Sequence, residues 1–156
     1  MKDIISKIQE KMLREGWKLA TAESCTSGRI AAMLTSISGA SNYFQGSMVA
    51  YQDWVKEEYL DVDEEDIKKY DVVSQPVVER MVQGACHMFH SHYAVATTGY
   101  AGDGMNGIPA GTIWIGWGTW LEQHSLCLHL SGSREENTQQ AAEEVLKQLL
   151  KYLEER

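Results

Sequence analysis

A short polar segment, Ser24–Ser27, carries the first side chains that could do chemistry. It contains two serines, a cysteine and a threonine between an apolar segment and a predicted helix, so it predicts a strand-to-helix turn. Backbone N–H groups at a helix start have no partner within the helix and can stabilise an anion. Ser24 is therefore either an N-cap or a nucleophile whose oxyanion those N–H groups would stabilise.

A serine nucleophile needs a base, and the histidines do not supply an evident one. No Gly-x-Ser-x-Gly motif is present to form a nucleophile elbow. A lysine can act as the base if burial lowers its pKa. Lys56 lies five residues after Tyr51, just past a predicted strand. Strand ends of a parallel sheet meet at one edge, where Ser24, Tyr51 and Lys56 would converge; otherwise Lys56 is a solvated surface residue.

Two further segments could bind a ligand. Residues 98–111 hold five glycines after another predicted strand, and glycines let the backbone approach a phosphate or a sugar closely. The segment matches neither a P-loop nor a dinucleotide fingerprint, and a mobile surface loop is the alternative. Arg134 begins the last predicted helix, where a cation opposes the helix dipole. It either binds an anion with that helix terminus or is an ordinary exposed arginine.

The elements that must position these residues alternate along the chain. Apolar spacing predicts helices over residues 2–15, 29–37 and 135–154, and a helix that begins after Ser74. Strands are predicted over residues 18–22, 46–51, 92–97, 112–117 and 125–130, with short helices in the acidic segment 53–71. This order predicts a three-layer α/β/α sandwich with a mixed, mainly parallel sheet of about five strands, in a single domain over residues 1–156.

Composition narrows the class of protein. The 156 residues are 44% hydrophobic and 23% charged, with a net charge of −8. An acidic chain is not a general DNA or RNA binder, and no signal peptide or membrane-spanning run is visible. The three cysteines, Cys25, Cys86 and Cys127, are widely spaced and form no Cys-x-x-Cys motif. They predict reduced thiols and a cytoplasmic protein.

The acidic charge is concentrated around the candidate base. Residues 53–71 hold nine acidic and three basic side chains, a net charge of −6. Nearby carboxylates raise the pKa of a lysine and oppose its role as a base. A Ser–Lys mechanism therefore requires Lys56 to point inward, while Glu57, Glu58 and the acidic residues of 61–66 face solvent.

Taken together, these segments resemble a known family over nearly the whole chain. The resemblance is to the CinA C-terminal domain family, the competence/damage-inducible CinA-like group. The matching segments are Thr21–Gly28, Gly39–Gly46, Val49–Tyr51 with Lys56, Val73–Ser74, Thr98–Gly102, Pro109–Thr112 and Gly132–Arg134.

The resemblance implies an amidohydrolase that converts nicotinamide mononucleotide (NMN) to nicotinic acid mononucleotide and ammonia. The family uses a serine–lysine pair and needs no metal or cofactor. The implied partners are a small nucleotide or amide substrate and further copies of the chain, as a homodimer or higher homo-oligomer, with no nucleic acid or membrane. The chain is expected to be the form without the additional N-terminal domain of larger CinA proteins. By position, Ser24 would be the nucleophile, Lys56 the base and Tyr51 its support, Thr26 and Ser27 the oxyanion donors, and Gly99, Ala101, Gly102, Gly104 and Arg134 the substrate-binding residues.

The sequence also departs from the family pattern. Ser27 replaces a second glycine, and the loop 103–109 is shorter, with Asp103 in place of a proline and Ile108 in place of a lysine. Ser133 and Thr138 replace an aspartate and a second arginine. The lysine replaced by Ile108 and the arginine replaced by Thr138 are two lost cationic contacts. Their loss would lower affinity for a mononucleotide by about a hundredfold or more. A hydrolase acting on a less anionic substrate, a non-catalytic nucleotide-binding relative and an enzyme with Cys25 as nucleophile therefore remain alternatives.

Overall fold

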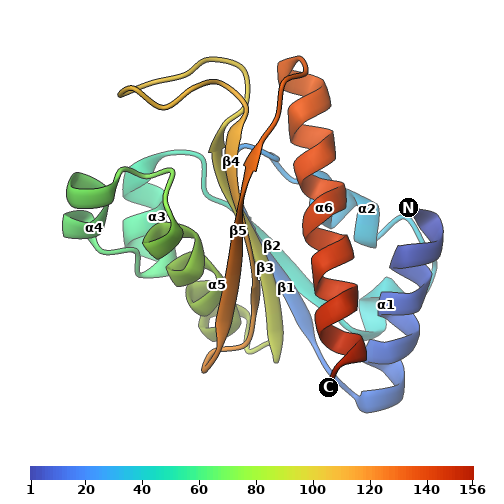
Figure 1. Cartoon of the computed structure of the whole chain (residues 1–156). Coiled ribbons are helices and arrows are strands. Elements are labelled where there is room, and N and C mark those ends of the chain that lie inside the picture. Colours follow the sequence, from blue (N-terminus) through green and yellow to red (C-terminus); the bar gives the residue numbers. More distant parts are fainter.

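A five-stranded sheet lies between two layers of helices in the computed structural model, which describes residues 1–156 (Figure 1). The strand order is β2-β1-β3-β4-β5. β1 pairs in parallel with both β2 and β3, whereas β3–β4 and β4–β5 are antiparallel. Only β4 therefore runs against the other four strands, and the predicted mixed sheet is confirmed. The strands are β1 Leu19–Glu23, β2 Phe44–Val49, β3 Tyr93–Tyr100, β4 Thr112–Gly118 and β5 Gln123–His129.

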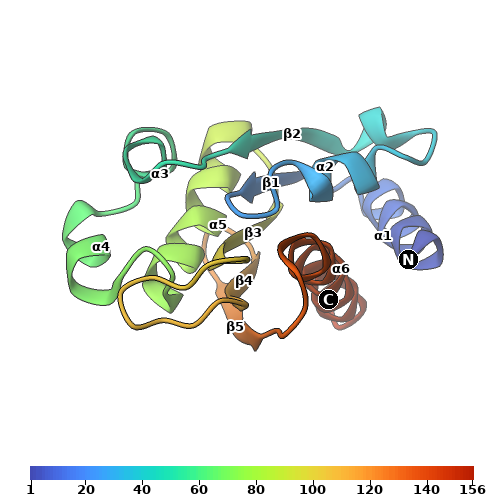
Figure 2. The same ribbon diagram turned by 90° about the horizontal axis from the view of Figure 1, so that it is seen from above.

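The helices divide between the two faces of the sheet. One layer holds α1 (Lys2–Glu15), α2 (Arg29–Leu34) and α6 (Arg134–Glu154). The other holds α3 (Asp53–Leu60), α4 (Glu64–Tyr70) and α5 (Gln75–Phe89), and the view from above separates the two groups (Figure 2). A short 3₁₀ helix, Ala40–Asn42, precedes β2. The predicted three-layer α/β/α arrangement is confirmed.

Two apolar cores account for these layers. One lies beneath α1, α2 and α6 and includes Ile8 and Leu146, while the other lies beneath α5 and includes Val78 and Met81. All five residues of β1 are buried because helices cover the sheet on both sides. The polar segment Ser24–Ser27 thus follows a strand that is fixed from both faces.

Local signals set several helix ends as predicted. Gly16 follows α1 with φ 71°, the left-handed conformation that glycine adopts without a steric penalty. Ser133 and Glu136 form the predicted capping box at the start of α6. Ser74 occupies the N-cap position of α5, but its hydroxyl donates to the carbonyl oxygen of Asp71 instead of capping the helix.

Several predicted boundaries are wrong. β2 begins and ends two residues earlier than expected, and β5 begins two residues earlier. The helix expected over 29–37 ends at Leu34, where the hydroxyls of Thr35 and Ser36 donate to backbone carbonyls of the preceding turn. The strand expected to end at residue 97 continues to Tyr100, because β3 keeps pairing with β4. Gly99 therefore lies within a strand and not in a loop.

Two further features concern the whole chain. None of its helices combines the length and the apolar character needed to cross a membrane. Cys25, Cys86 and Cys127 are all free thiols, as predicted.

Candidate active site

A pocket of about 590 Å³ opens at the carboxyl ends of β1 and β3. The segment 24–25 after β1, α3 and its preceding turn, the end of β3 and the start of α6 all contribute to its wall. Ligands bind at this edge of many α/β sheets. Among the predicted site residues, the pocket brings together Ser24, Tyr51, Lys56, Gly99, Ala101 and Arg134.

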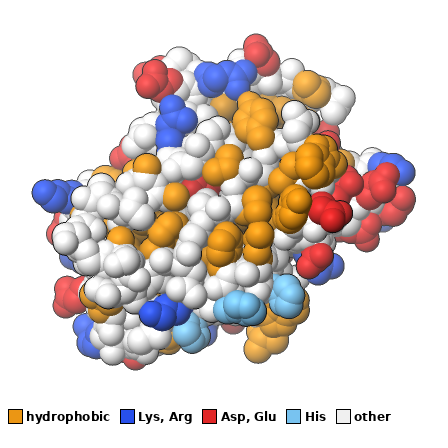
Figure 3. Space-filling model, turned by 180° about the vertical axis from the view of Figure 1, so that it is seen from behind, with side chains coloured by type: hydrophobic (Ala, Val, Ile, Leu, Met, Phe, Trp, Pro, Cys, Tyr) orange, Lys and Arg blue, Asp and Glu red, His pale blue; other side chains and the backbone are white.

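Lys56 is buried at this pocket, with only 1% of its surface exposed. Its Nζ atom donates a hydrogen bond of 3.1 Å to the carbonyl oxygen of Tyr51. Burial lowers the pKa of Lys56, and the opposing influence of Asp53 and Cys25 is smaller. The predicted inward orientation is confirmed. Glu58 on the same helix is exposed, and Figure 3 shows acidic side chains gathered at the edge of the molecule formed by α4.

Ser24 follows β1 directly and is 7% exposed. Its N–H donates to the carbonyl of Thr97 at 3.2 Å, which ties the residue to β3. Gly28 occupies the N-cap position of α2, so the interpretation of Ser24 as an N-cap is wrong. The Ser24 hydroxyl makes no hydrogen bond within the protein, to Lys56 or to any other group.

The oxyanion donors differ in part from the prediction. The N–H of Ser27 donates to the carbonyl of Ser24 at 3.0 Å, closing a turn, so it is not free for an oxyanion. No backbone carbonyl accepts a hydrogen bond from the N–H groups of Cys25 and Thr26. The N–H groups of Cys25 and Thr26 are therefore the candidate oxyanion donors, because the N–H group of Ser27 is already bonded within the turn.

A buried carboxylate occupies the start of α2. Glu23 accepts hydrogen bonds from the N–H groups of Gly28, Ile30 and Ala31 at 2.9–3.1 Å, and from the hydroxyl of Thr26 at 2.8 Å. The N–H groups of this helix thus bind the protein's own anion, not a substrate. This role of Glu23 was not predicted, although an acidic residue between an apolar strand and a helix start is a usable signal in the sequence.

Tyr51 holds Lys56 through its backbone carbonyl and not through its phenol. Its side chain is 58% exposed, and its hydroxyl makes no hydrogen bond. The lysine is held by the backbone oxygen of Tyr51, so the support does not depend on the phenol.

Of the four residues from 99 to 104 that were predicted to bind substrate, only two reach the pocket. Gly99 and Ala101 line the pocket, but Gly102 and Gly104 do not. A Cβ at Gly104 would lie 2.5 Å from the carbonyl oxygen of Ile108, so this glycine is required by the packing of the loop. A Cβ at Gly102 would lie 2.6 Å from Nε of Arg134. Gly102 therefore leaves space for that guanidinium and does not contact the pocket itself.

The pocket wall is more acidic than the sequence analysis foresaw. Arg134 pairs with Asp103 at 3.1 Å. Asp71 accepts hydrogen bonds from the Tyr100 hydroxyl and the Asn106 side chain, both at 2.9 Å. With Asp53, three carboxylates line the pocket. No group of three or more His, Cys, Asp or Glu side chains is arranged to hold a metal ion.

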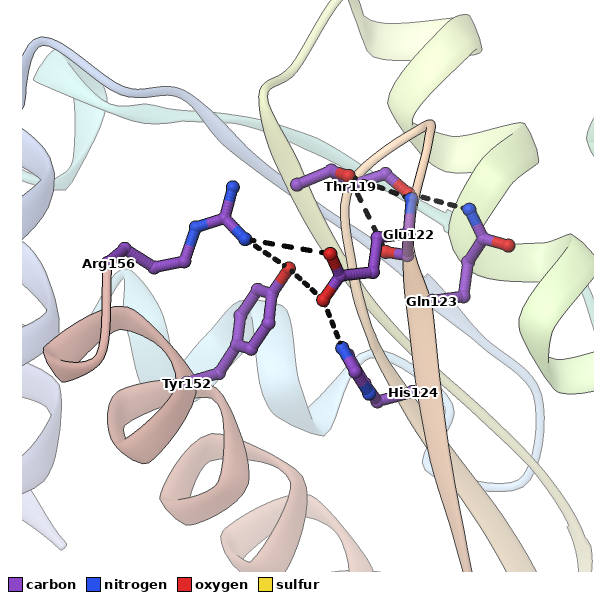
Figure 4. Close-up of polar contacts among 6 residues, drawn as sticks. All are labelled: Thr119, Glu122, Gln123, His124, Tyr152 and Arg156. Atoms are coloured by element: carbon purple, nitrogen blue, oxygen red, sulfur yellow. Dashed lines mark hydrogen bonds and ion pairs between the residues drawn. The ribbon is translucent and has the colours of Figure 1, made fainter.

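A separate polar cluster lies at the opposite end of the molecule (Figure 4). Glu122 binds the ring of His124 and accepts from the Tyr152 hydroxyl at 3.2 Å, while Arg156 donates to that hydroxyl at 2.8 Å. The hydrogen bond with His124 is the main cause of the lowered pKa of Glu122. The cluster joins the β4–β5 hairpin to the end of α6 and is not part of the pocket.

Comparison with known proteins assigns the family. The CinA C-terminal domain matches this chain over residues 1–153. The chain belongs to the CinA family. The predicted resemblance is thereby confirmed over nearly the full length of the CinA chain.

Individual relatives agree with this assignment. A CinA-like protein of Cytophaga hutchinsonii is 37% identical over 150 residues, which are 95% of this chain but 36% of that protein. This CinA chain therefore spans about a third of the length of that relative. Protein YdeJ of Escherichia coli is 29% identical over 155 residues, covering 98% of this chain and 90% of that protein.

Solved structures share the CinA fold. The competence damage-inducible protein A of Klebsiella pneumoniae is similar with a TM-score of 0.94 and 28% identity, covering 97% of this chain and 96% of that one. A competence/damage inducible protein of Agrobacterium tumefaciens is similar with a TM-score of 0.92 and 27% identity, covering 98% and 94%.

Proposed function

We propose that this CinA-family chain is a Ser–Lys amidohydrolase that cleaves the carboxamide of NMN. The observation that carries the proposal is the buried Lys56, with its pKa lowered by burial, in the same pocket as the unbonded hydroxyl of Ser24. A lysine base must be neutral to accept a proton, and burial favours the neutral amine. No hydrogen bond joins the two side chains in this structure. Catalytic hydrogen bonds commonly tighten only when substrate binds.

The reaction would proceed in two halves. Lys56 accepts the hydroxyl proton as Ser24 Oγ attacks the carboxamide carbon, and the carbonyl oxygen becomes an oxyanion near the N–H groups of Cys25 and Thr26. Lys56 returns the proton to the departing nitrogen, and the C–N bond breaks. Ammonia is released, and the acyl group remains bound to Ser24 as an ester. Water then attacks the ester carbon, and its proton passes through Lys56 to Ser24 Oγ. The products are a carboxylic acid and the free enzyme.

A second candidate is a carboxamide that lacks the phosphate. The carboxylates of Asp53, Asp71 and Asp103 line the pocket, and Asp103 already pairs with Arg134. This arrangement favours a neutral or cationic carboxamide next to the acidic wall. Nicotinamide riboside, which carries the same ring and ribose without phosphate, represents this class.

Ammonia release from NMN, nicotinamide riboside and nicotinamide tests both candidates. We expect release from NMN that falls below detection in Ser24→Ala and in Lys56→Met. The matched controls are Ser41→Ala and Lys147→Met, whose side chains are exposed and make no hydrogen bond or ion pair. Undiminished activity in Ser24→Ala would overturn the mechanism. Faster release from the riboside than from NMN would favour the second candidate.

The non-catalytic alternative has its own test. A fluorophosphonate probe labels an activated serine, and the labelled peptide is identified by mass spectrometry. We expect modification of Ser24 that disappears in Lys56→Met. A chain that neither reacts with the probe nor releases ammonia would instead be a binding protein.

A further inference from the structure

A second hollow, of about 320 Å³, adjoins the catalytic pocket between α2 and α6. Cys25, Tyr51 and Arg134 line both cavities. A molecule whose reacting group lies at Ser24 can therefore extend into this hollow. Arg29, which the sequence analysis did not single out, belongs to the hollow and not to the catalytic pocket.

The two cavities differ in charge. The catalytic pocket has three aspartates against Lys56 and Arg134. The hollow has Arg29 and Arg134 against one acidic side chain, Glu135. The lining of this hollow therefore carries net positive charge next to the proposed nucleophile, in a chain of net charge −8. On its other side Arg29 borders a hollow lined by Glu135, Glu136 and Glu143.

Both guanidinium groups can accept a new anionic partner. Arg29 makes no side-chain hydrogen bond and no ion pair, although it is half-buried. Arg134 has only its ion pair with Asp103, in which both side chains are more than half exposed. Exposed pairs of this kind are weak, so an anion can compete with Asp103. The hydroxyl of Ser27, which also lines the hollow, makes only a long bond of 3.4 Å to the Ser24 carbonyl.

From this arrangement we infer that the hollow is a phosphate-binding subsite in which Arg29 is the principal new contact. Arg29 and Arg134 together suit a phosphate monoester, because each guanidinium group can donate two charge-assisted hydrogen bonds to phosphate oxygens. Thr138, on α6, lines the same hollow as Arg29 of α2. Position 138 on α6 carries a threonine where the family pattern has an arginine. Arg29 on α2 would replace that cationic contact. The inference rests on the proposed function in one respect only, namely that the bound phosphate belongs to the substrate whose carboxamide reacts at Ser24.

Binding to the Ser24→Ala variant tests the subsite without any need for catalysis. Isothermal titration calorimetry would compare ribose 5-phosphate, ribose and inorganic phosphate. We expect ribose 5-phosphate to bind, and Arg29→Gln to weaken that binding by about tenfold or more, since a contact between charged groups is lost. Arg29→Lys should restore part of the affinity. Arg14→Gln, on the exposed face of α1, is the matched control and should change nothing.

The titration either supports or overturns the phosphate subsite. Equal affinity of Arg29→Gln and its parent for ribose 5-phosphate, or no binding of ribose 5-phosphate to the parent, would overturn the inference. Binding of inorganic phosphate with the same dependence on Arg29, competing with ribose 5-phosphate, supports a subsite for the phosphate itself. If NMN releases no ammonia but ribose 5-phosphate binds through Arg29, the proposed reaction fails while the subsite stands.

Discussion

The amine of Lys56 donates to the backbone carbonyl of Tyr51 across 3.1 Å, while the phenol of the same tyrosine is exposed. A neutral amine can donate one hydrogen to that carbonyl and still use its lone pair to accept a proton. Because the acceptor belongs to the backbone, the position of the Lys56 amine depends on the turn between β2 and α3.

Replacement of Tyr51 by Phe therefore should not alter the titration of Lys56. The backbone carbonyl is retained, so we expect the pH dependence of kcat/KM to keep its midpoint. Any loss of activity should appear in KM, because the side chain lines both cavities. A displaced midpoint in Tyr51→Phe would show that the hydroxyl orients the lysine after all.

Replacement of Asp53 by Asn should shift the pH profile to lower pH. The proposed mechanism requires neutral Lys56, so kcat/KM should rise with pH through the lysine pKa and then level off. Asp53 raises that pKa against the larger lowering effect of burial. Removing the carboxylate lowers the pKa further, so the rise begins at lower pH. Glu58→Gln, an exposed change on the same helix, is the control and should leave the profile in place.

Replacement of Glu23 by Gln should destabilise the fold. The carboxylate accepts from three backbone N–H groups at the start of α2, and an amide turns one acceptor oxygen into a donor. Leaving a buried donor unpaired costs about 1–3 kcal/mol, so we expect the free energy of unfolding to fall by at least that much. Urea denaturation followed by circular dichroism measures it. Glu154→Gln, on an exposed side chain, should be nearly neutral, and equal stability of the two variants would contradict this account of Glu23.

Replacement of Asp103 by Asn should favour ligands that carry a phosphate. The change releases Arg134 from its ion pair and removes a negative charge from the pocket wall. Because an exposed pair contributes about 0.2–1 kcal/mol, affinity for ribose 5-phosphate should rise by a factor of about 1.4 to 5. Calorimetry on the Ser24→Ala background measures it, with ribose as the ligand that should not respond. Weaker phosphate binding in Asp103→Asn would mean that the pair holds Arg134 in its binding position.

Much of the architecture is visible in the sequence because its causes are local. The apolar period of residues 2–15 and the glycine at 16 define α1, and the Ser133–Glu136 spacing defines the start of α6. The inward position of Lys56 was expected only from the hypothesis of a Ser–Lys mechanism, because a base among so many carboxylates needs burial to lower its pKa. The boundaries at Leu34 and Tyr100, which were wrong, depend on side-chain competition for carbonyls and on pairing with β4.

The candidate site likewise combines features that the sequence determines with features that only the tertiary structure determines. Sequence alone determined which residues could react, because serine, lysine and the turn between a strand and a helix have fixed chemistry. Only the tertiary structure decided which groups are free to do so. In the folded chain the N–H groups at the start of α2 donate to Glu23, and the N–H group of Ser27 is bonded within a turn. Arg29 and Arg134 line the same hollow. Those outcomes depend on contacts between distant segments and on competition for hydrogen bonds, which residue type and spacing do not encode.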